Sequence, residues 1–357
     1  MGLDSALLYG ETDPMTGRVI SLMAAAVPVL FTLQVGCKRP DVQLADASHY
    51  ELGEVQECAE HVDGFARMTE RAVEMGIDLE VQGDYEKGAC GYIPGSVVAQ
   101  DIELDGDVDI LYNNRRGAPH LYLNDGTGNF TSAEGHLPGI YEDRDFYAIG
   151  LVDINGDHLP ELWATGLGML LWSENLGDLQ FGEWNVVYFQ ADYPMECHSS
   201  VSFGDIDADG DLDLVLPGLD EAPDAEHLMT EADTGWLPSY DRLYMNRDGQ
   251  FEMVMELSPE GEPGFSLVQA FTDRDRDGDL DLLSGTDRPV EGLFPPQAFF
   301  RNEGMDDDGV PILFNDAPEL GADVRVSAMG LGINDLNSDG FLDYCMSDVA
   351  TQLTCLL

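Results

Sequence analysis

The chain has 357 residues, of which 44% are hydrophobic and 24% are charged, a composition typical of soluble globular domains. Its 69 Asp and Glu residues outnumber 16 Lys and Arg residues, which gives a formal net charge of −53 at pH 7. Phosphate backbones and anionic membrane surfaces repel such a chain, so nucleic-acid binding is excluded. The length suits two ordinary domains or one large repeat fold.

The first predicted element is an apolar run at residues 19–35, which follows Arg18 and ends in Gly36 and Cys37. The run is short for a transmembrane helix and suits the apolar region of a secretion signal. It resembles a bacterial lipoprotein signal, which implies a signal peptide at 1–37 and a lipid anchor on Cys37 as the membrane contact. The protein would then be exported, to the outer membrane or cell surface. Ordinary secretion and a buried helix are the alternatives, and Met15 competes with Met1 as the start.

Residues 38–57 are polar without a clear period, so we expect a flexible tether there and a folded domain at 58–357. The cysteines of that domain form no CxxC pair, which argues against structural zinc. In an exported protein we expect disulfides, with Cys58–Cys90 and Cys345–Cys355 as the nearest pairs and Cys197 left over. Buried free thiols are the alternative.

A nonapeptide pattern then recurs five times, starting at Asp101, Asp153, Asp205, Asp273 and Asp335. Oxygen-bearing side chains stand at positions 1, 3, 5 and 9 of every copy, and Gly stands at position 6 of four copies. A hard cation such as Ca²⁺ binds about six to eight oxygens, and a tight turn lets alternate residues converge on one point. The repeat therefore indicates a cation loop.

The loops are predicted to join β-strands rather than helices. An EF-hand needs Glu at position 12, and none of the five copies has it. Short apolar runs with a period of two flank the loops, such as residues 200–204 and 214–216 around the third copy. Small residues alternate with the apolar ones, as expected where strands crowd around a common axis.

A second motif follows the loop in four repeats, at residues 121–124, 171–175, 243–246 and 299–302. Each copy ends in Asn and leads through a turn with Gly to another aromatic residue, a pattern typical of a β-hairpin. Two strands around the loop and two in the hairpin make a four-stranded antiparallel blade, the unit of a β-propeller.

These loops, strands and hairpins resemble FG-GAP/VCBS repeats, the group that includes the propellers of integrin α-subunits. The resemblance runs from about Phe65 to the C-terminus, and residues 65–77 are similar to the opening segment of secreted bacterial VCBS proteins related to the ASPIC/UnbV group. It implies an all-β propeller outside the cytoplasm, stabilised by about five structural Ca²⁺ ions. The ligands that it implies are the side chains at positions 1, 3, 5 and 9 and the backbone carbonyl at position 7. They are Asp101, Glu103, Asp105, Asp107 and Asp109; Asp153, Asn155, Asp157, Leu159 and Glu161; Asp205, Asp207, Asp209, Asp211 and Asp213; Asp273, Asp275, Asp277, Asp279 and Asp281; and Asp335, Asn337, Asp339, Phe341 and Asp343.

The repeats predict about five blades, where propellers of this group usually have seven. Because the chain ends soon after Asp343, either an N-terminal segment supplies the missing outer strands of a closed five-bladed ring or the ring is part of a larger one. The second loop has His158 in place of Gly and Glu161 in place of Asp, which predicts the weakest cation site.

The expected function is non-catalytic recognition, adhesion or scaffolding, with an extracellular protein or carbohydrate as partner. Insertions at 218–241 and 287–297 are the candidate recognition surface, through Trp236, Tyr240, Phe294, Pro295 and Pro296. A mobile acidic flap is the alternative. The sequence carries no GxSxG, HExxH or phosphate-binding loop motif, so no catalytic residue is predicted. A hydrolase or lyase on the central face is the alternative function.

Overall fold

The computed structural model describes a compact unit from Glu70 to Leu357, apart from several connecting segments. The described residues are 70–77, 95–113, 119–139, 141, 146–189, 196–218, 220–221, 236–237, 239–258, 261, 263–287, 295–348 and 353–357. The predicted signal peptide, Cys37, the tether and the Cys58–Cys90 pair lie outside them. Among the described residues, no helix has the length and apolar character needed to cross a membrane.

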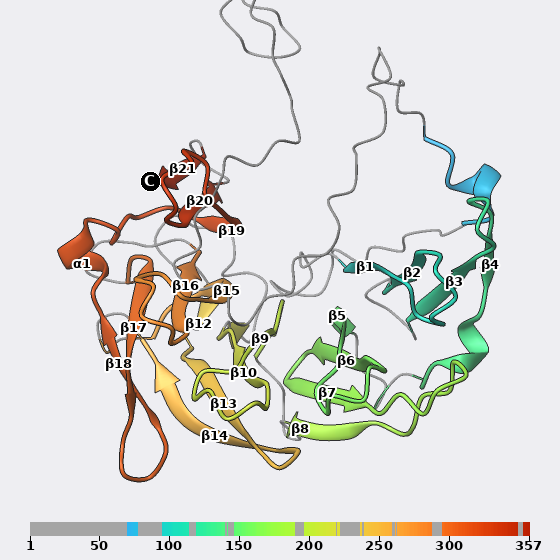
Figure 1. Cartoon of the computed structure of the whole chain (residues 1–357), viewed down its shortest axis with the longest axis horizontal. Helices are drawn as coiled ribbons and strands as arrows, with labels where there is room; N and C mark the ends of the chain where they lie inside the picture. The colour runs from blue at the N-terminus through green and yellow to red at the C-terminus, as the bar shows by residue number, and fades with distance from the viewer. Residues whose placement is uncertain are drawn as a thin grey trace, which may run out of the picture. The chain divides into compact units, whose positions relative to one another are not determined.

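Five antiparallel sheets follow one another along the chain, and each is one blade (Figure 1). Blade one holds β1 (Val97–Gln100), β2 (Asp109–Tyr112), β3 (His120–Asn124) and β4 (Phe130–Ser132). Blade two holds β5 (Phe146–Val152), β6 (Glu161–Gly166), β7 (Met169–Ser173) and β8 (Asn185–Phe189). Blade three holds β9 (Ser202–Gly204), β10 (Asp213–Leu216), β13 (Asp241–Arg247) and β14 (Gln250–Leu257). Blade four holds β15 (Ser266–Thr272), β16 (Asp281–Thr286), β17 (Ala298–Met305) and β18 (Pro311–Asn315). Blade five holds β19 (Ala328–Asn334), β20 (Asp343–Asp348) and β21 (Thr354–Leu356).

Short elements lie between and before the blades. Strands β11 (Asp220–Glu221) and β12 (Trp236–Leu237) pair with each other between β10 and β13. The 3-10 helices η2 (Val73–Met75) and η4 (Glu134–His136) and the helix α1 (Ala317–Leu320) are each a single turn. Gly76, which ends η2 with φ +94°, lies so close to the Phe130 carbonyl that a Cβ would come within 2.3 Å of it. The opening segment is therefore built against β4.

The expected all-β propeller with about five blades is confirmed by this topology. The first strands are innermost, because β1 lies beside β5 and β15 lies beside both β9 and β19. Because successive strands of a blade are antiparallel, the turn between its first and second strands and the turn between its third and fourth strands lie at the same end of the blade. Blade five has three strands in the part of the chain that the structure describes, so the expected fourth strand from an N-terminal segment stays a prediction.

The second strand of each middle blade is buried along its whole length, as β6, β10 and β16 show. Both faces of such a strand pack against neighbouring sheets, so after its acidic first residue it consists of apolar and small side chains. The cores lie between successive blades, and the one between blades two and three centres on Trp163. Its ring contacts Trp172, Phe203 and Phe251 at centroid distances of 6.1, 4.8 and 5.4 Å. Trp172 stacks on this ring, whereas Phe203 and Phe251 meet it edge-to-face, and both kinds of aromatic contact add to the free energy gained by burying apolar area.

Buried polar side chains also link each blade to the next, because a hydrogen bond satisfies a polar group that the core would otherwise leave unpaired. The bonds join Asn113 Nδ2 to the Phe146 carbonyl (2.8 Å), Thr165 Oγ1 to the His198 carbonyl (2.6 Å), Ser284 Oγ to Asp241 Oδ2 (2.6 Å) and Gln297 Nε2 to the Val326 carbonyl (2.7 Å). Each of the four successive boundaries therefore has its own polar bridge.

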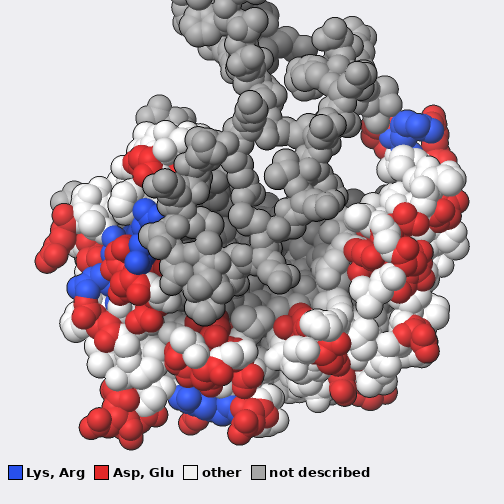
Figure 2. Space-filling view, viewed as in Figure 1, with Lys and Arg blue, Asp and Glu red and all other residues white. Residues whose placement is uncertain are grey.

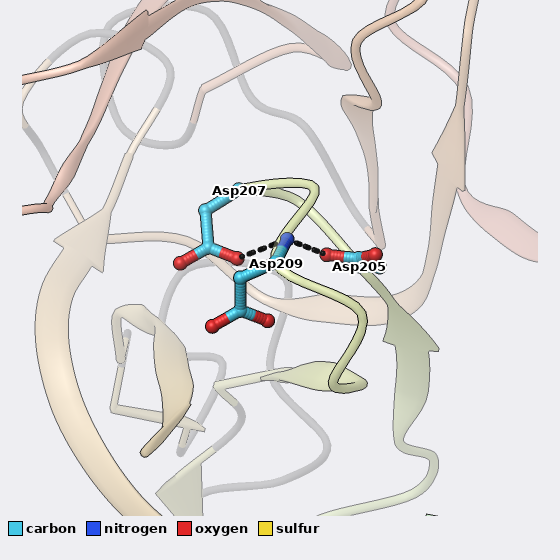
Figure 3. Close-up of side chains that lie close together, drawn as sticks. All are labelled: Asp205, Asp207 and Asp209. Atoms are coloured by element: carbon cyan, nitrogen blue, oxygen red, sulfur yellow. Dashed lines mark hydrogen bonds between the residues drawn. The ribbon is translucent and has the colours of Figure 1, made fainter. Parts of the chain in front are cut away.

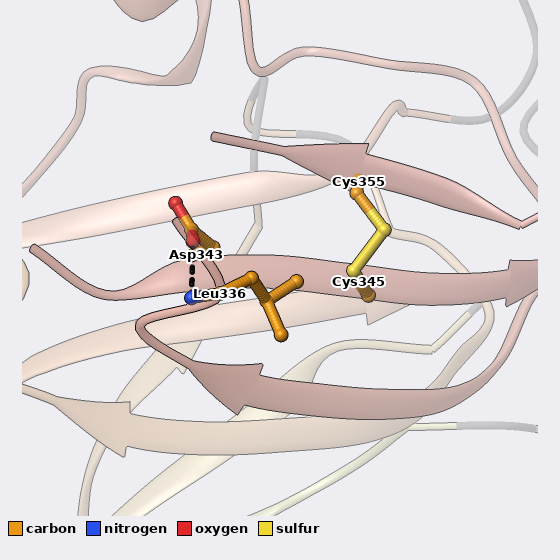
Figure 4. The surroundings of a disulfide bond; sticks show 4 residues. All are labelled: Leu336, Asp343, Cys345 and Cys355. Atoms are coloured by element: carbon orange, nitrogen blue, oxygen red, sulfur yellow. Dashed lines mark hydrogen bonds between the residues drawn. A yellow bond between two sulfur atoms is a disulfide. The ribbon is translucent and has the colours of Figure 1, made fainter. Parts of the chain in front are cut away.

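The predicted disulfide between Cys345 and Cys355 is confirmed, and it joins β20 to β21 at paired positions of the two strands (Figure 4). Cys197, which was expected to be left over, is disulfide-bonded, so that expectation is wrong. Its main chain pairs with Leu167 in the β6–β7 turn, so the segment between β8 and β9, which leads from blade two to blade three, is held against blade two.

Candidate metal centre

Each nonapeptide forms the turn between the first and second strands of its blade, as predicted. The five turns share one backbone signature, a positive φ at positions 4 and 6. At position 4 the residues are Leu104 (59°), Gly156 (75°), Ala208 (57°), Arg276 (65°) and Ser338 (62°). At position 6 they are Gly106 (100°), His158 (72°), Gly210 (102°), Gly278 (100°) and Gly340 (90°). A left-handed residue with a Cβ is strained by about 1–2 kcal/mol, so every loop carries one such residue and one glycine.

The second loop keeps this signature with its two residues exchanged. Gly156 occupies position 4, and His158 occupies position 6 with the smaller φ. The absence of Gly at position 6 is therefore offset by Gly156 at position 4. The sequence pattern did not indicate this, because it gave no sign that position 4 also has a positive φ. The weaker cation affinity expected for this loop stays a prediction, and it now rests on Asn155 and Glu161 rather than on backbone strain.

The carboxylate at position 1 caps the turn. In loops one, three and five, Asp101, Asp205 and Asp335 each accept hydrogen bonds from the backbone N–H groups of positions 5 and 6, at 2.9–3.1 Å. In loop two the Asp153 carboxylate accepts from Gly156 and His158 instead, at 2.7 and 2.9 Å. In these four loops the turn fixes the position-1 side chain, which preorganises it for a cation.

The acidic residue at position 9 is buried in all five loops and has a structural bond in each. One of its oxygens accepts the backbone N–H of position 2, from Ile102, Ile154, Ile206, Arg274 and Leu336, at 2.9, 2.9, 3.0, 3.1 and 2.6 Å. The second carboxylate oxygen of Asp109, Asp213 and Asp281 accepts the backbone N–H of the Asn that ends the third-strand motif, at 2.8–2.9 Å. Position 9 therefore closes the loop and ties it to the third strand.

The Asn of the hairpin motif has a role that the sequence did not indicate. In four blades its side-chain amide donates to the carbonyl at position 8 of the loop, from Asn124, Asn175, Asn246 and Asn302, at 3.0, 3.1, 3.3 and 3.2 Å. Its side-chain oxygen accepts an N–H from a glycine of the hairpin turn, at Gly126, Gly177, Gly249 and Gly304. One side chain thus joins the cation loop to the neighbouring hairpin turn.

Two loops bring three carboxylates together. In loop three, ligand atoms of Asp205, Asp207 and Asp209 lie within 4.8 Å of one another (Figure 3). The same holds for Asp273, Asp275 and Asp277 in loop four. These are the groups of three or more acidic, His or Cys side chains found among the described residues. Both groups consist of positions 1, 3 and 5. Loops two and five carry Asn at position 3, so they offer fewer carboxylates.

The electrostatics of these loops favour a cation. Burial, followed by the charge of Asp209, raises the pKa of Asp207. Burial raises the pKa of Asp213 to about 7, and it also raises the pKa values of Glu161 and Asp281. Asp273 Oδ1 is buried and has no hydrogen-bond partner among the described residues. Because an orphaned carboxylate oxygen costs free energy and the donors are all oxygens, the set fits a hard cation such as Ca²⁺.

A buried ionic cluster lies between blades two and three, and no pattern in the sequence predicted it. Arg242 in β13 forms two hydrogen bonds with Glu196, at 2.8 and 2.5 Å, and Tyr188 of β8 donates a third at 2.5 Å. Burial opposes the charge of Glu196, but nearby His198 and the hydrogen bonds from Arg242 and Tyr188 outweigh it and hold the pKa of Glu196 well below its usual range. The cluster braces the boundary, and His198 Nε2, which lies 3.6 Å from Glu196 Oε2, has no hydrogen-bond partner among the described residues. Its members are far apart in sequence and match no motif.

The two insertions lie mainly outside the described residues. Pro295 and Pro296, which were expected to form part of an exposed recognition surface, are buried, so that expectation is wrong for this pair. Tyr240 is half-buried, and Phe294 lies outside the described part of the chain. Acidic side chains are spread over the face shown in Figure 2, where basic side chains form a few small groups.

Comparison with known proteins supports the nature of the repeats. The family model for FG-GAP-like repeats matches residues 101–164 and 153–216, which include the first three loops. The chain therefore contains FG-GAP-like repeats. A T-cell immunomodulatory protein homolog of Plasmodium yoelii yoelii is 25% identical over 234 residues, which are 51% of this chain and 33% of that protein. The chain thus spans about a third of the length of this relative.

Two solved structures are similar at low identity. One is an Agrocybe aegerita lectin that recognises non-reducing terminal N-acetylglucosamine, with 18% identity and a TM-score of 0.43 over 72% of this chain and 61% of that chain. The other is the V. cholerae biofilm matrix protein Bap1, with 12% identity and a TM-score of 0.35 over 74% and 37% of the two chains.

Proposed function

We propose that this propeller binds Ca²⁺ in its five loops and works outside the cytoplasm as a non-catalytic recognition module for a protein or carbohydrate ligand. The convergence of three carboxylates in each of loops three and four supports the proposal most directly. In a chain of net charge −53, such groups repel one another, and a divalent cation turns the repulsion into attraction. The shared turn geometry extends the proposal to the other three loops.

Calcium has a structural role in this proposal. Each ion would hold a turn between the first and second strands, while position 9 and the hairpin Asn link that turn to the rest of the blade. For dissociation constants of about 10⁻⁴ M and about 1 mM free ion, each site contributes about 1.4 kcal/mol to the free energy of unfolding. Five sites would contribute about 7 kcal/mol, which is comparable to the whole stability of a typical domain.

Recognition is proposed for the end of the blades that faces away from the loops. In an antiparallel blade, turns between the second and third strands lie at the end opposite to turns between the first and second. Both long connections, at residues 217–240 and 287–297, are turns of this kind. Connecting turns on a rigid scaffold are the usual place for ligand contacts. Export, through a lipid on Cys37 or by secretion, is part of the same proposal.

Calorimetric titration with Ca²⁺ tests the metal sites. Asp209→Ala and Asp277→Ala should each lower the number of bound ions by about one, because each removes a carboxylate from a convergent group. Asp307→Ala is the matched control, since it removes an exposed charge from the tip of the β17–β18 hairpin. Wild-type protein that takes up no Ca²⁺ at millimolar concentration would contradict the proposal.

Recognition needs a second experiment. The labelled propeller is applied to glycan and protein arrays in excess Ca²⁺ and again after chelation. We expect binding to a defined ligand in Ca²⁺ that is lost with the chelator. Turnover of an array ligand without retention of the protein would favour the hydrolase or lyase alternative.

A further inference from the structure

A basic side chain lies against one of the two convergent carboxylate groups. Arg247 is the last residue of β13 and follows the hairpin Asn of blade three. Its Nη1 lies 3.5 Å from Asp207 Oδ2, which belongs to position 3 of loop three. The Asp207 side chain is 8% exposed and the Arg247 side chain is 38% exposed, so the pair is shielded from water on the side of the loop.

The same arginine is held from the other side by blade four. Its Nη2 donates a 2.6 Å hydrogen bond to the carbonyl of Gly309, near the tip of the β17–β18 hairpin. Gly309 has φ +72°, and a Cβ on it would lie 3.3 Å from Nη2. A larger residue would therefore press on the guanidinium, which indicates that the close approach depends on glycine.

The position is specific to blade three. The residue that follows the hairpin Asn is Asp125 in blade one, Leu176 in blade two and Glu303 in blade four. Blade three thus has a positive charge, directly beside a ligand group, at a place where blades one and four have a negative charge and blade two has none. The positive charge of Arg247 counteracts the rise that burial and Asp209 cause in the Asp207 pKa.

We propose that Arg247 is an internal counter-ion of loop three, which competes with the divalent cation for Asp207 and lowers the cation affinity of this loop. The inference rests on the proposed Ca²⁺ binding. A guanidinium stays protonated at every relevant pH, so it cannot leave the site as a neutral group. When a divalent cation takes Asp207, two positive centres share one carboxylate, and the cation binds more weakly than it would without the arginine.

Calorimetric titration of Arg247→Gln with Ca²⁺ tests the inference. We expect loop three to bind about threefold to tenfold more tightly, the range for removing one partly screened charge near a ligand. Arg247→Lys keeps the charge and should bind as the wild type does. Arg71→Gln is the matched control, because Arg71 forms an exposed ion pair with Glu74 and its loss changes the net charge equally.

The Asp209→Ala background shows whether the change in affinity belongs to loop three, because this substitution removes a ligand carboxylate from that loop. In that background Arg247→Gln should leave the remaining affinities unchanged. Equal or weaker binding by Arg247→Gln in the wild-type background would overturn the inference, as would an Arg247→Lys variant that binds like Arg247→Gln. If Asp209→Ala binds as many ions as the wild type, the proposed function itself fails at loop three. The two failures are therefore distinguishable.

Discussion

The carboxylate of Asp241 accepts a 2.6 Å hydrogen bond from the hydroxyl of Ser284 across the boundary between blades three and four. Its other oxygen accepts the backbone N–H of Gly218 at 2.9 Å, and both side chains are buried. Burial raises the pKa of Asp241, although the bonds from Ser284 and Gly218 oppose the rise. The boundary between these two blades therefore contains a group that binds a proton more readily than the same group in the unfolded chain.

This relationship predicts a pH dependence. Between the unfolded and folded pKa values of Asp241, the folded state binds more protons than the unfolded state, so the free energy of unfolding falls as pH rises. Asp241→Asn removes this contribution, and its stability relative to the wild type should increase with pH. Urea unfolding at fixed excess Ca²⁺ from pH 4 to pH 8 measures it, with exposed Asp307→Asn as control. A relative stability that does not change with pH would show that Asp241 titrates alike in both states.

Removal of Ca²⁺ should lower the melting temperature. The carboxylates of loops three and four lie within 4.8 Å of one another, and without a cation they repel. Melting followed by circular dichroism in excess Ca²⁺ and then in chelator, at one ionic strength, gives the comparison. We expect a loss of several kcal/mol in the free energy of unfolding. An unchanged midpoint contradicts the structural role of the ion.

Replacing the hairpin Asn with Ala should destabilise the protein by an amount that depends on the blade. Asn302 is buried, and its amide bonds both the position-8 carbonyl of its own loop and the Ile206 carbonyl of loop three at 3.0 Å. Asn302→Ala should cost about 2–3 kcal/mol, since it leaves buried carbonyls unpaired. Asn124→Ala should cost about 1 kcal/mol, because Asn124 is more exposed and its amide bonds only its own loop among the described residues. Equal costs in chemical denaturation would show that the link between blades three and four contributes nothing.

Glycine substitutions test the turn geometry. Gly210 has φ +102°, and a Cβ there would meet nothing within 4 Å, so Gly210→Ala measures backbone strain alone. It should cost about 1–2 kcal/mol, and Gly156→Ala should cost a similar amount in loop two. Gly150→Ala is the matched control, because it has the same open space without a positive φ. Were Gly210→Ala as harmless as Gly150→Ala, the shared turn signature would be wrong.

Local pattern was enough to predict the blades, the loops and the hairpins, because each is encoded by residues close together in sequence. The left-handed residue at position 4 could not be read, since Leu104, Ala208 and Arg276 give no sign of positive φ. The bond from the hairpin Asn to position 8 and the cluster around Glu196 join residues that come together only when strands pair. Burial of Pro295 likewise depends on its approach to Gly264, about thirty residues earlier in the chain, which no short window of sequence contains.

The disulfide between Cys345 and Cys355 has a mechanical consequence. Strand β21 is three residues long and pairs with β20 through three residue pairs, a weak attachment by itself. The covalent bond sends a pull on Leu357 directly into β20, and it keeps about 30 Å of chain between the two cysteines from being drawn out. A propeller held at one end of its chain and loaded at the other would keep its last strand in place under tension that three backbone pairs could not bear.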